Sequence, residues 1–443
     1  MNSRKLNLLT SLLIGIVVSS TASAGIVEHA VRAPAAGVDV IVYPMGVKDV
    51  ITVMGSLPAG DSYAAQGNIA AATLTGLMLD KGTTKQDKLA IAKQLDDAGA
   101  QLAFDVDAQM VTLQARLLKK DLPLVLRLMA QELRTPAFSS EEFAKVKKQF
   151  EASVIRAQQD TNERAAQAFS NAVYPAAHPN RQHTSEEWLA AADKITVEDL
   201  KSFHDKYYGP AHFTLVFVGD VDASRIRREV AQAFAGWTGG VDVVRAVAGG
   251  TIQGPREEAV QLADKASVSV RLGQQISLRY QDRDSLALRV GTQILGSDFT
   301  SRLMSTVRDQ EGLTYGIRAQ IADDTFVEGD WSIRGAFSPQ LLDRGIVSTR
   351  RELAKWWQDG VTAAELDVRK TNMTGSYKVG LATSAGMARA ILQTVDRGMP
   401  LTWLDDYPTA IRALTVEQVN TAIKKYLDPQ KMVLVKVGTV PTS

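Results

Sequence analysis

The run Phe213-Thr-Leu-Val-Phe-Val-Gly-Asp-Val221 recurs in similar form as Met432-Val-Leu-Val-Lys-Val-Gly-Thr-Val440, and this repeat indicates how the chain is organised. The two copies are separated by a constant offset of 219 residues. Each copy is rich in β-branched residues and reaches a glycine, which is typical of a buried strand followed by a turn. A strand that returns in this way predicts two copies of one structural unit.

The residues before each strand repeat with the same offset. Residues 195–200 recur as 414–419, and 206–210 recur as 425–429. In both copies a threonine with a glutamate two residues later indicates the start of a helix, and a proline marks the region where the helix has ended. Three segments in one register predict an internal duplication.

The boundary between the copies is predicted at 236–255, where glycines and a proline interrupt the periodic pattern. We therefore expect an N-terminal domain at 25–235, a linker at 236–255 and a C-terminal domain at 256–443. Within the first domain the patterns predict helices and strands in mixed order. The predicted strands are 38–43, 49–54 and 109–115, and the predicted helices are 68–79, 88–97, 122–132 and 140–157. Such a mixture indicates the α+β class, with two homologous α/β-layer domains.

The first 24 residues have the pattern of a secretory signal peptide. Arg4 and Lys5 precede an apolar run at 6–18, and Ala22-Ser-Ala24 forms a cleavage site. A membrane anchor is the alternative, but the run is shorter than the roughly 20 apolar residues that span a bilayer. We therefore expect cleavage after Ala24 and a periplasmic location, in a chain without cysteine.

The charge balance argues against a nucleic-acid or membrane-surface protein. Cleavage would remove Arg4 and Lys5 from 50 basic residues, leaving 48 against 49 acidic residues and a formal net charge of −1. Such a balance provides no broad basic surface for phosphates. We therefore expect neither a nucleic-acid partner nor a membrane span after cleavage.

Two stretches, 67–83 and 301–316, resemble characteristic segments of the pitrilysin/insulinase-type zinc peptidases, the inverzincins. Shorter pieces in the same order extend the resemblance over nearly the whole mature chain. It implies two homologous domains that face each other as a half-clam. The two-domain members related to subunits of the mitochondrial processing peptidase have this arrangement.

The zinc motif of that family, H-x-x-E-H, is missing. Counted back from Lys81-Gly-Thr83, its positions fall on Thr73, Gly76 and Leu77, and the third ligand falls near Val154, with Glu151 about one turn away. Zinc needs imidazole, thiolate or carboxylate donors, and these positions cannot supply a set of them. We expect no metal in this chain.

No histidine lies between Ala30 and Ala177, so a shift of register cannot restore the motif. We interpret the five histidines as surface or turn residues, and their spacing does not suit two ligands on one helix. They are His29, His178, His183, His204 and His212. One alternative is a self-sufficient peptidase that binds its metal at another place in the chain.

Arg308 and Tyr315 match the arginine and tyrosine that the family places in its C-terminal domain. The resemblance implies that they bind substrate and stabilise the negative charge that develops on a peptide carbonyl. Gly312 is expected to end the helix that carries Arg308. The alternative is an ion pair for Arg308 and ordinary packing for Tyr315. Ser301 and Arg302 are expected to cap and tether the helix.

The pattern matches family members that work as heterodimers. In these, one chain carries the zinc ligands and the other supplies the arginine and tyrosine. We therefore predict a non-zinc subunit of a periplasmic heterodimeric metallopeptidase, with zinc in the homologous partner and a peptide or unfolded segment as substrate. The substrate would add a strand to the partner's sheet edge. The alternative from another class is a non-catalytic scaffold or peptide-binding protein.

Overall fold

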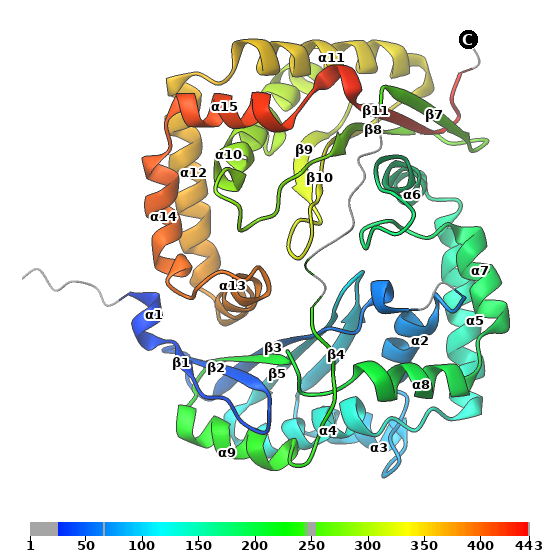
Figure 1. The fold of residues 1–443 in the computed structure, drawn as a ribbon, viewed down its shortest axis with the longest axis vertical. Helices are drawn as coiled ribbons and strands as arrows, with labels where there is room; N and C mark the ends of the chain where they lie inside the picture. The colour runs from blue at the N-terminus through cyan, green and yellow to red at the C-terminus, as the bar shows by residue number, and fades with distance from the viewer. Residues whose placement is uncertain (1–24, 65–66, 244, 246–253, 442–443) are drawn as a thin grey trace, which may run out of the picture.

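The computed structural model describes residues 25–64, 67–243, 245 and 254–441, and Figure 1 shows two stacked halves, each built on a β-sheet. The predicted signal peptide at 1–24 and part of the predicted linker, 244 and 246–253, lie outside the described residues. None of the helices in the described ranges is long and apolar enough to cross a membrane.

The first half of the chain forms a sheet with the strand order β1-β2-β6-β3-β5-β4. The strands are β1 (Val31–Arg32), β2 (Asp39–Pro44), β3 (Val50–Leu57), β4 (Gln101–Val106), β5 (Val111–Leu118) and β6 (Thr214–Gly219). The helices of this half are α1 (Ile26–His29), the short helix η1 (Asp61–Tyr63), α2 (Ala71–Met78), α3 (Lys88–Asp97), α4 (Leu122–Arg134), α5 (Ser140–Ala157), α6 (Thr161–Val173), α7 (Ser185–Lys194), α8 (Val197–Tyr207) and α9 (Ala223–Ala233).

The second half forms a sheet with the strand order β7-β11-β8-β10-β9. The strands are β7 (Arg256–Gln261), β8 (Val268–Gln275), β9 (Ile317–Ala322), β10 (Asp330–Phe337) and β11 (Val433–Gly438). The helices are α10 (Ser285–Gly296), α11 (Leu342–Asp359), α12 (Ala363–Leu381), α13 (Ser384–Asp396), α14 (Trp403–Ala413) and α15 (Val416–Tyr426), with a π-helical segment, η3, at Met304–Gln310.

The repeated segments occupy equivalent places, which confirms the α+β class with two homologous units. β6 pairs with β2 in parallel and with β3 antiparallel, and β11 pairs in the same way with β7 and β8. The helices before them, α8 and α15, both begin with a capping box, Thr196 with Asp199 and Thr415 with Gln418. The side chain that completes each box lies three residues after the threonine, one beyond the glutamate that the sequence indicated.

Each sheet is covered on one face by helices of its own half and on the other face by a helix of the opposite half. The apolar residues of α6, including Phe169, pack on Val433, Val435 and Val437 of β11. Helix α13 packs on Ile41, Met54, Val216 and Val218 of the first sheet. Figure 1 shows both helices between the two sheets. This exchange buries apolar surface between the halves and joins them through their cores.

Two predicted elements begin two or three residues later than the sequence pattern indicated. The strand predicted at 109–115 is β5, which starts at Val111, because the Asp107 carboxylate accepts hydrogen bonds from the backbone N–H groups of Gln109 and Met110 and holds them in a turn. The helix predicted at 68–79 starts at Ala71, after a turn in which Ala71 N–H donates to the Asn68 carbonyl.

Candidate functional site

Helix α2 carries the three positions where the zinc motif would stand. Thr73 Oγ1 donates a hydrogen bond of 2.7 Å to Asp61 Oδ1 in η1. Leu77 is 43% exposed, and Gly76 is buried. Thr73, at the predicted position of the first histidine ligand, therefore bonds a neighbouring carboxyl group. Leu77, at the predicted position of the second, has no group that could bind zinc.

The position of the catalytic glutamate is sterically filled. A Cβ atom added to Gly76 would overlap with Cγ2 of Val106 in the edge strand β4. Cγ2 is attached directly to the Cβ of a strand residue, so it cannot move away without a rotamer change or a shift of the strand. A glutamate side chain at this position would therefore require Val106 or β4 to move.

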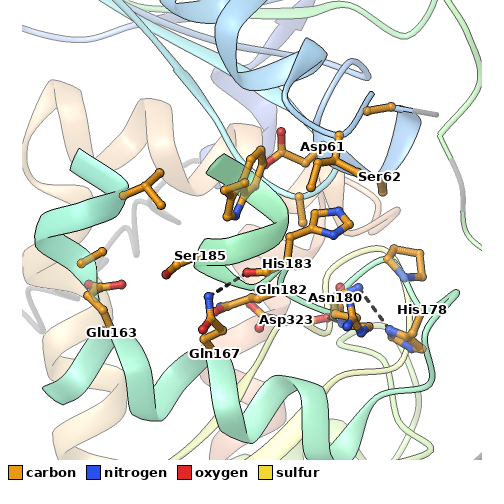
Figure 2. Close-up of a pocket in the computed structure, with 18 of the residues that line it drawn as sticks. Asp61, Ser62, Glu163, Gln167, His178, Asn180, Gln182, His183, Ser185 and Asp323 are labelled. Carbon is orange, nitrogen blue, oxygen red and sulfur yellow. Dashed lines mark hydrogen bonds between the residues drawn. The ribbon is translucent and has the colours of Figure 1, made fainter. Parts of the chain in front are cut away.

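A cavity of about 650 Å³ lies beside these positions and brings together residues of η1, α5, α6 and the loop after α6. Its lining includes Asp61, the bonding partner of Thr73, and Val154, the position of the third ligand. Figure 2 shows Asp61 on one side and Glu163 and Gln167 of α6 on another. The structure thus gathers three of the predicted positions, Thr73, Leu77 and Val154, on helices α2 and α5, which contact each other.

The polar groups of the cavity are largely engaged with one another. Gln167 Nε2 donates to the His183 carbonyl at 2.8 Å, and Asn180 N–H donates to His178 Nδ1 at 3.1 Å. Both bonds are drawn in Figure 2. His178 also stacks on Tyr174 with ring centroids 4.4 Å apart. Burial lowers the pKa of His178 to about 4, so this imidazole is neutral at physiological pH.

These donors do not fit zinc. In the described part of the chain no three His, Cys, Asp or Glu side chains are grouped so that they could hold a metal ion. His178 and His204 are buried, at 5% and 6% exposure, and His204 Nε2 hydrogen-bonds the Leu133 carbonyl at 2.8 Å. The interpretation of His204 as a surface or turn residue is wrong, because the imidazole on α8 faces the core.

Buried carboxyl groups near the interface of the two halves were not found from the sequence. Tyr174 Oη donates to Asp330 Oδ2 at 3.0 Å, and Asn180 Nδ2 donates to the Asp323 carbonyl at 2.8 Å. Burial raises the pKa of Asp330 to about 7 and that of Asp396 to about 6. The loop after α6 is therefore tied to the second sheet through a network that is sensitive to protonation.

Arg308 and Tyr315 lie on the second half, away from this cavity. Arg308 belongs to η3, stacks over Phe299 at 4.9 Å from the ring centroid, and approaches Asp309 Oδ1 at 3.4 Å. Tyr315 is 97% exposed and lies two residues before β9. Within the described part of the chain no hydrogen bond, ion pair or ring contact joins the two, and neither residue lines the cavity beside α2.

The segment between them turns as the sequence indicated. Gly312 has φ +65°, a conformation that favours glycine, directly after Glu311 closes the helical segment. Arg302 is tethered to the start of α12 through Glu365, with Nε 2.6 Å from Oε1, and to the Gly360 carbonyl at 2.9 Å. Ser301 Oγ donates to the Asp298 carbonyl and does not cap the helix. The π-helical form of η3 was not anticipated.

Comparison with known proteins agrees with this duplicated fold. The family model described as "Insulinase (Peptidase family M16)" matches residues 49–184, and the model described as "Peptidase M16 inactive domain" matches residues 194–373. The chain belongs to peptidase family M16. The two matched ranges together cover most of the described residues.

Individual M16 proteins are similar over most of their length. The "Non-peptidase homolog YmxG" of Helicobacter pylori is 20% identical, with 83% of this chain and 84% of that protein covered. An uncharacterized zinc protease of Mycobacterium tuberculosis is 24% identical, with 79% of this chain and 80% of that protein covered. The sequence similarity thus reaches both a relative named as a non-peptidase and one named as a protease.

Solved structures share the fold of this M16 chain. The peptidase M16 inactive domain from Pseudomonas fluorescens has a TM-score of 0.83 at 25% identity and covers 94% of this chain and 98% of its own. A protease from Helicobacter pylori has a TM-score of 0.80 at 19% identity, with 92% and 98% covered. The chain is an M16-family protein of the inactive kind, and its own α2 site lacks the zinc-binding groups.

Proposed function

We propose that this chain is the non-zinc subunit of an exported, periplasmic M16 metallopeptidase heterodimer. In this proposal the homologous partner carries H-x-x-E-H and zinc, and this chain supplies Arg308 and Tyr315 in trans. The observation that carries the proposal is a contrast. A Cβ atom at Gly76 of α2 would overlap with Val106, whereas Tyr315, within the segment 301–316 that resembles the family signature, is 97% exposed.

The exposure of Tyr315 explains why the pair would act only in a complex. A phenol or guanidinium donor stabilises a developing oxyanion strongly only where water is excluded. Tyr315 in the single chain is almost fully in water. A second chain that covers this surface would desolvate the phenol and bring a substrate carbonyl within its reach, so we expect the isolated chain to be inactive.

Peptide or unfolded protein is the expected substrate. An extended segment would add a strand to the partner's sheet, where main-chain hydrogen bonds give affinity without a strict sequence requirement. In the partner, zinc would activate water and polarise the carbonyl. Arg308 and Tyr315 would donate hydrogen bonds to the same carbonyl oxygen as its negative charge develops.

The first test is to isolate the mature chain from its native periplasm through a C-terminal tag and identify its companions by mass spectrometry. A stoichiometric chain with H-x-x-E-H is the expected result. Recovery alone, as a homodimer, or with an unrelated complex would contradict the heterodimer.

The second test is Tyr315→Phe in the reconstituted pair. We expect turnover to fall roughly 100-fold, because one oxyanion donor is lost. The matched control is Tyr43→Phe, which removes a phenol hydroxyl from β2 in the first half. Full turnover in the Tyr315→Phe pair would remove the role assigned to Tyr315.

A second candidate is a non-catalytic scaffold or peptide-binding protein of the same fold. The close packing of Val106 on Gly76 favours it, because a catalytic side chain at Gly76 would overlap with Val106. The two candidates differ in the result expected for Tyr315→Phe. For a scaffold, this substitution would change neither the assembly nor any turnover of a complex that contains the chain.

A further inference from the structure

Three arginines stand side by side across the second sheet. Arg334 of β10 is directly opposite Arg271 of β8 on one side and directly opposite Arg318 of β9 on the other. Neighbouring strands are about 4.8 Å apart, so the three residues form a row across the sheet. We call Arg271, Arg334 and Arg318 the arginine row.

The row lies on the inner face of the sheet. Its neighbours along the strands, Leu272 and Ile333, are buried in the core on the opposite face. A cavity of about 420 Å³ lies over the row, and Asn162 and Ala165 of α6 line it from the other side. The three guanidinium groups thus border one shared cavity beside an exchanged helix.

The arrangement is costly without an anion. Like charges directly opposite each other destabilise a sheet. In the described chain none of the three arginines forms an ion pair, although other arginines of this half do, including Arg302 with Glu365 and Arg369 with Asp298. Burial lowers the pKa of Arg271; among the neighbouring charges Asp330 raises it most, Arg334 lowers it, and Asp323 and Glu163 raise it.

The arginine row ends at β9, the edge strand of its sheet, and this position favours an extended peptide as the ligand. β9 is the last strand of its sheet, so its outer edge has no neighbouring strand in the described residues. An extended peptide added to this edge would place one side chain directly opposite Arg318 and on the face of the row. A carboxylate there would accept paired hydrogen bonds from a guanidinium group.

We propose that the arginine row is a binding site for the carboxylates of an acidic, extended peptide that pairs with β9. Nucleic acid is not favoured, because the formal net charge of the whole chain is only +1. The site goes beyond the proposed function, in which the substrate pairs with the partner's sheet, and it requires neither the zinc partner nor turnover.

The test is calorimetric titration of the isolated mature chain at low salt with a short peptide in which glutamate alternates with threonine. The comparison peptide has glutamine in place of glutamate. We expect the glutamate peptide to bind at least about tenfold more tightly and to weaken as salt increases. Arg334→Gln, at the centre of the row, should lower the affinity for the glutamate peptide by roughly tenfold.

The matched control is Arg350→Gln, which removes an exposed arginine from α11. Equal affinity for the two peptides, or equal loss in the Arg334→Gln and Arg350→Gln variants, would overturn the proposal. Inorganic phosphate that displaces the peptide and binds more tightly would reassign the row to phosphate. Arg318→Gln at the sheet edge serves if Arg334→Gln does not fold, and it should also weaken the glutamate peptide selectively.

The two proposals fail separately. If the glutamate peptide binds through the row but no zinc-bearing partner is recovered, the heterodimer is wrong and the binding site stands. If the pair forms and cleaves peptides while Arg334→Gln leaves the affinity for the glutamate peptide unchanged, the binding site is wrong and the heterodimer stands.

Discussion

Helix α2 and the segment 304–316, which the resemblance predicts to correspond to the two parts of an M16 active site, differ in what surrounds them. On α2, Thr73 at the predicted first ligand position donates to Asp61, and Gly76 at the predicted glutamate position packs on Val106, so both residues contribute to the fold. In the other segment, Tyr315 is 97% exposed. Stability therefore explains the residues of α2, but it does not explain Tyr315.

The largest expected effect follows from the packing of α2. Gly76→Glu should lower the free energy of unfolding by about 3 kcal/mol, because the new side chain overlaps with Val106 and forces the helix or β4 to move. Urea denaturation measures the change. The control is Gly375→Glu in α12, where an added Cβ meets no atom within 4 Å; helix propensity should make this change neutral or stabilising.

A background substitution sharpens this test. In a Val106→Ala chain the cost of Gly76→Glu should be clearly smaller, since the overlapping methyl group is gone. An equal cost in both backgrounds would show that Val106 does not fill the position of the glutamate, and the contrast between the two regions would lose its steric basis.

A smaller effect is expected from Thr73. Thr73→Val keeps the shape of the side chain but removes the hydroxyl that donates to Asp61, which should cost about 1–2 kcal/mol. Thr371→Val, on the exposed side of α12, is the matched control and should change stability by less than about 0.5 kcal/mol. Equal effects at the two positions would mean that the Thr73–Asp61 bond does not stabilise the site.

Local patterns predicted the repeated elements well. Capping threonines and β-branched runs lie within short stretches of sequence, so α8, β6 and their copies α15 and β11 could be placed from the residues alone. These features need no knowledge of contacts between distant parts of the chain.

Features that depend on distant contacts could not be predicted. The apolar face of α6 indicates that it packs on a sheet but not that the sheet belongs to the other half. The overlap of Gly76 with Val106 needs the position of β4, and the arginine row needs the register of β8, β9 and β10. The spacing of residues along the sequence does not indicate any of these three contacts.

The pH dependence of stability tests the electrostatic side of the filled site. Burial raises the pKa of Asp61 to about 7, against the opposing effect of its bond from Thr73. The folded chain therefore holds a proton that the unfolded chain loses near pH 4, so Asp61 should reduce stability as pH rises from about 4 to 7. Asp61→Asn should make the free energy of unfolding fall less over this range.

The expected change is a shallower slope rather than a flat line, because Asp330 and Asp396 also have raised pKa values and remain in the variant. Urea denaturation at several pH values between 4 and 8 gives the slope. An unchanged slope in Asp61→Asn would show that the carboxyl group beside α2 is ionised in the folded chain as it is in the unfolded one.

The smallest effect on stability is expected at Tyr315. Tyr315→Ala should change the free energy of unfolding by less than about 0.5 kcal/mol, because the exposed side chain has few neighbours to lose. The same substitution should abolish most turnover of the reconstituted pair if Tyr315 acts in trans. A loss of several kcal/mol in the free energy of unfolding would show that Tyr315 stabilises the fold. The contrast between Tyr315 and the residues of α2 would then disappear. Unchanged stability together with unchanged turnover would instead favour the scaffold, since the exposed phenol would then serve neither the fold nor catalysis.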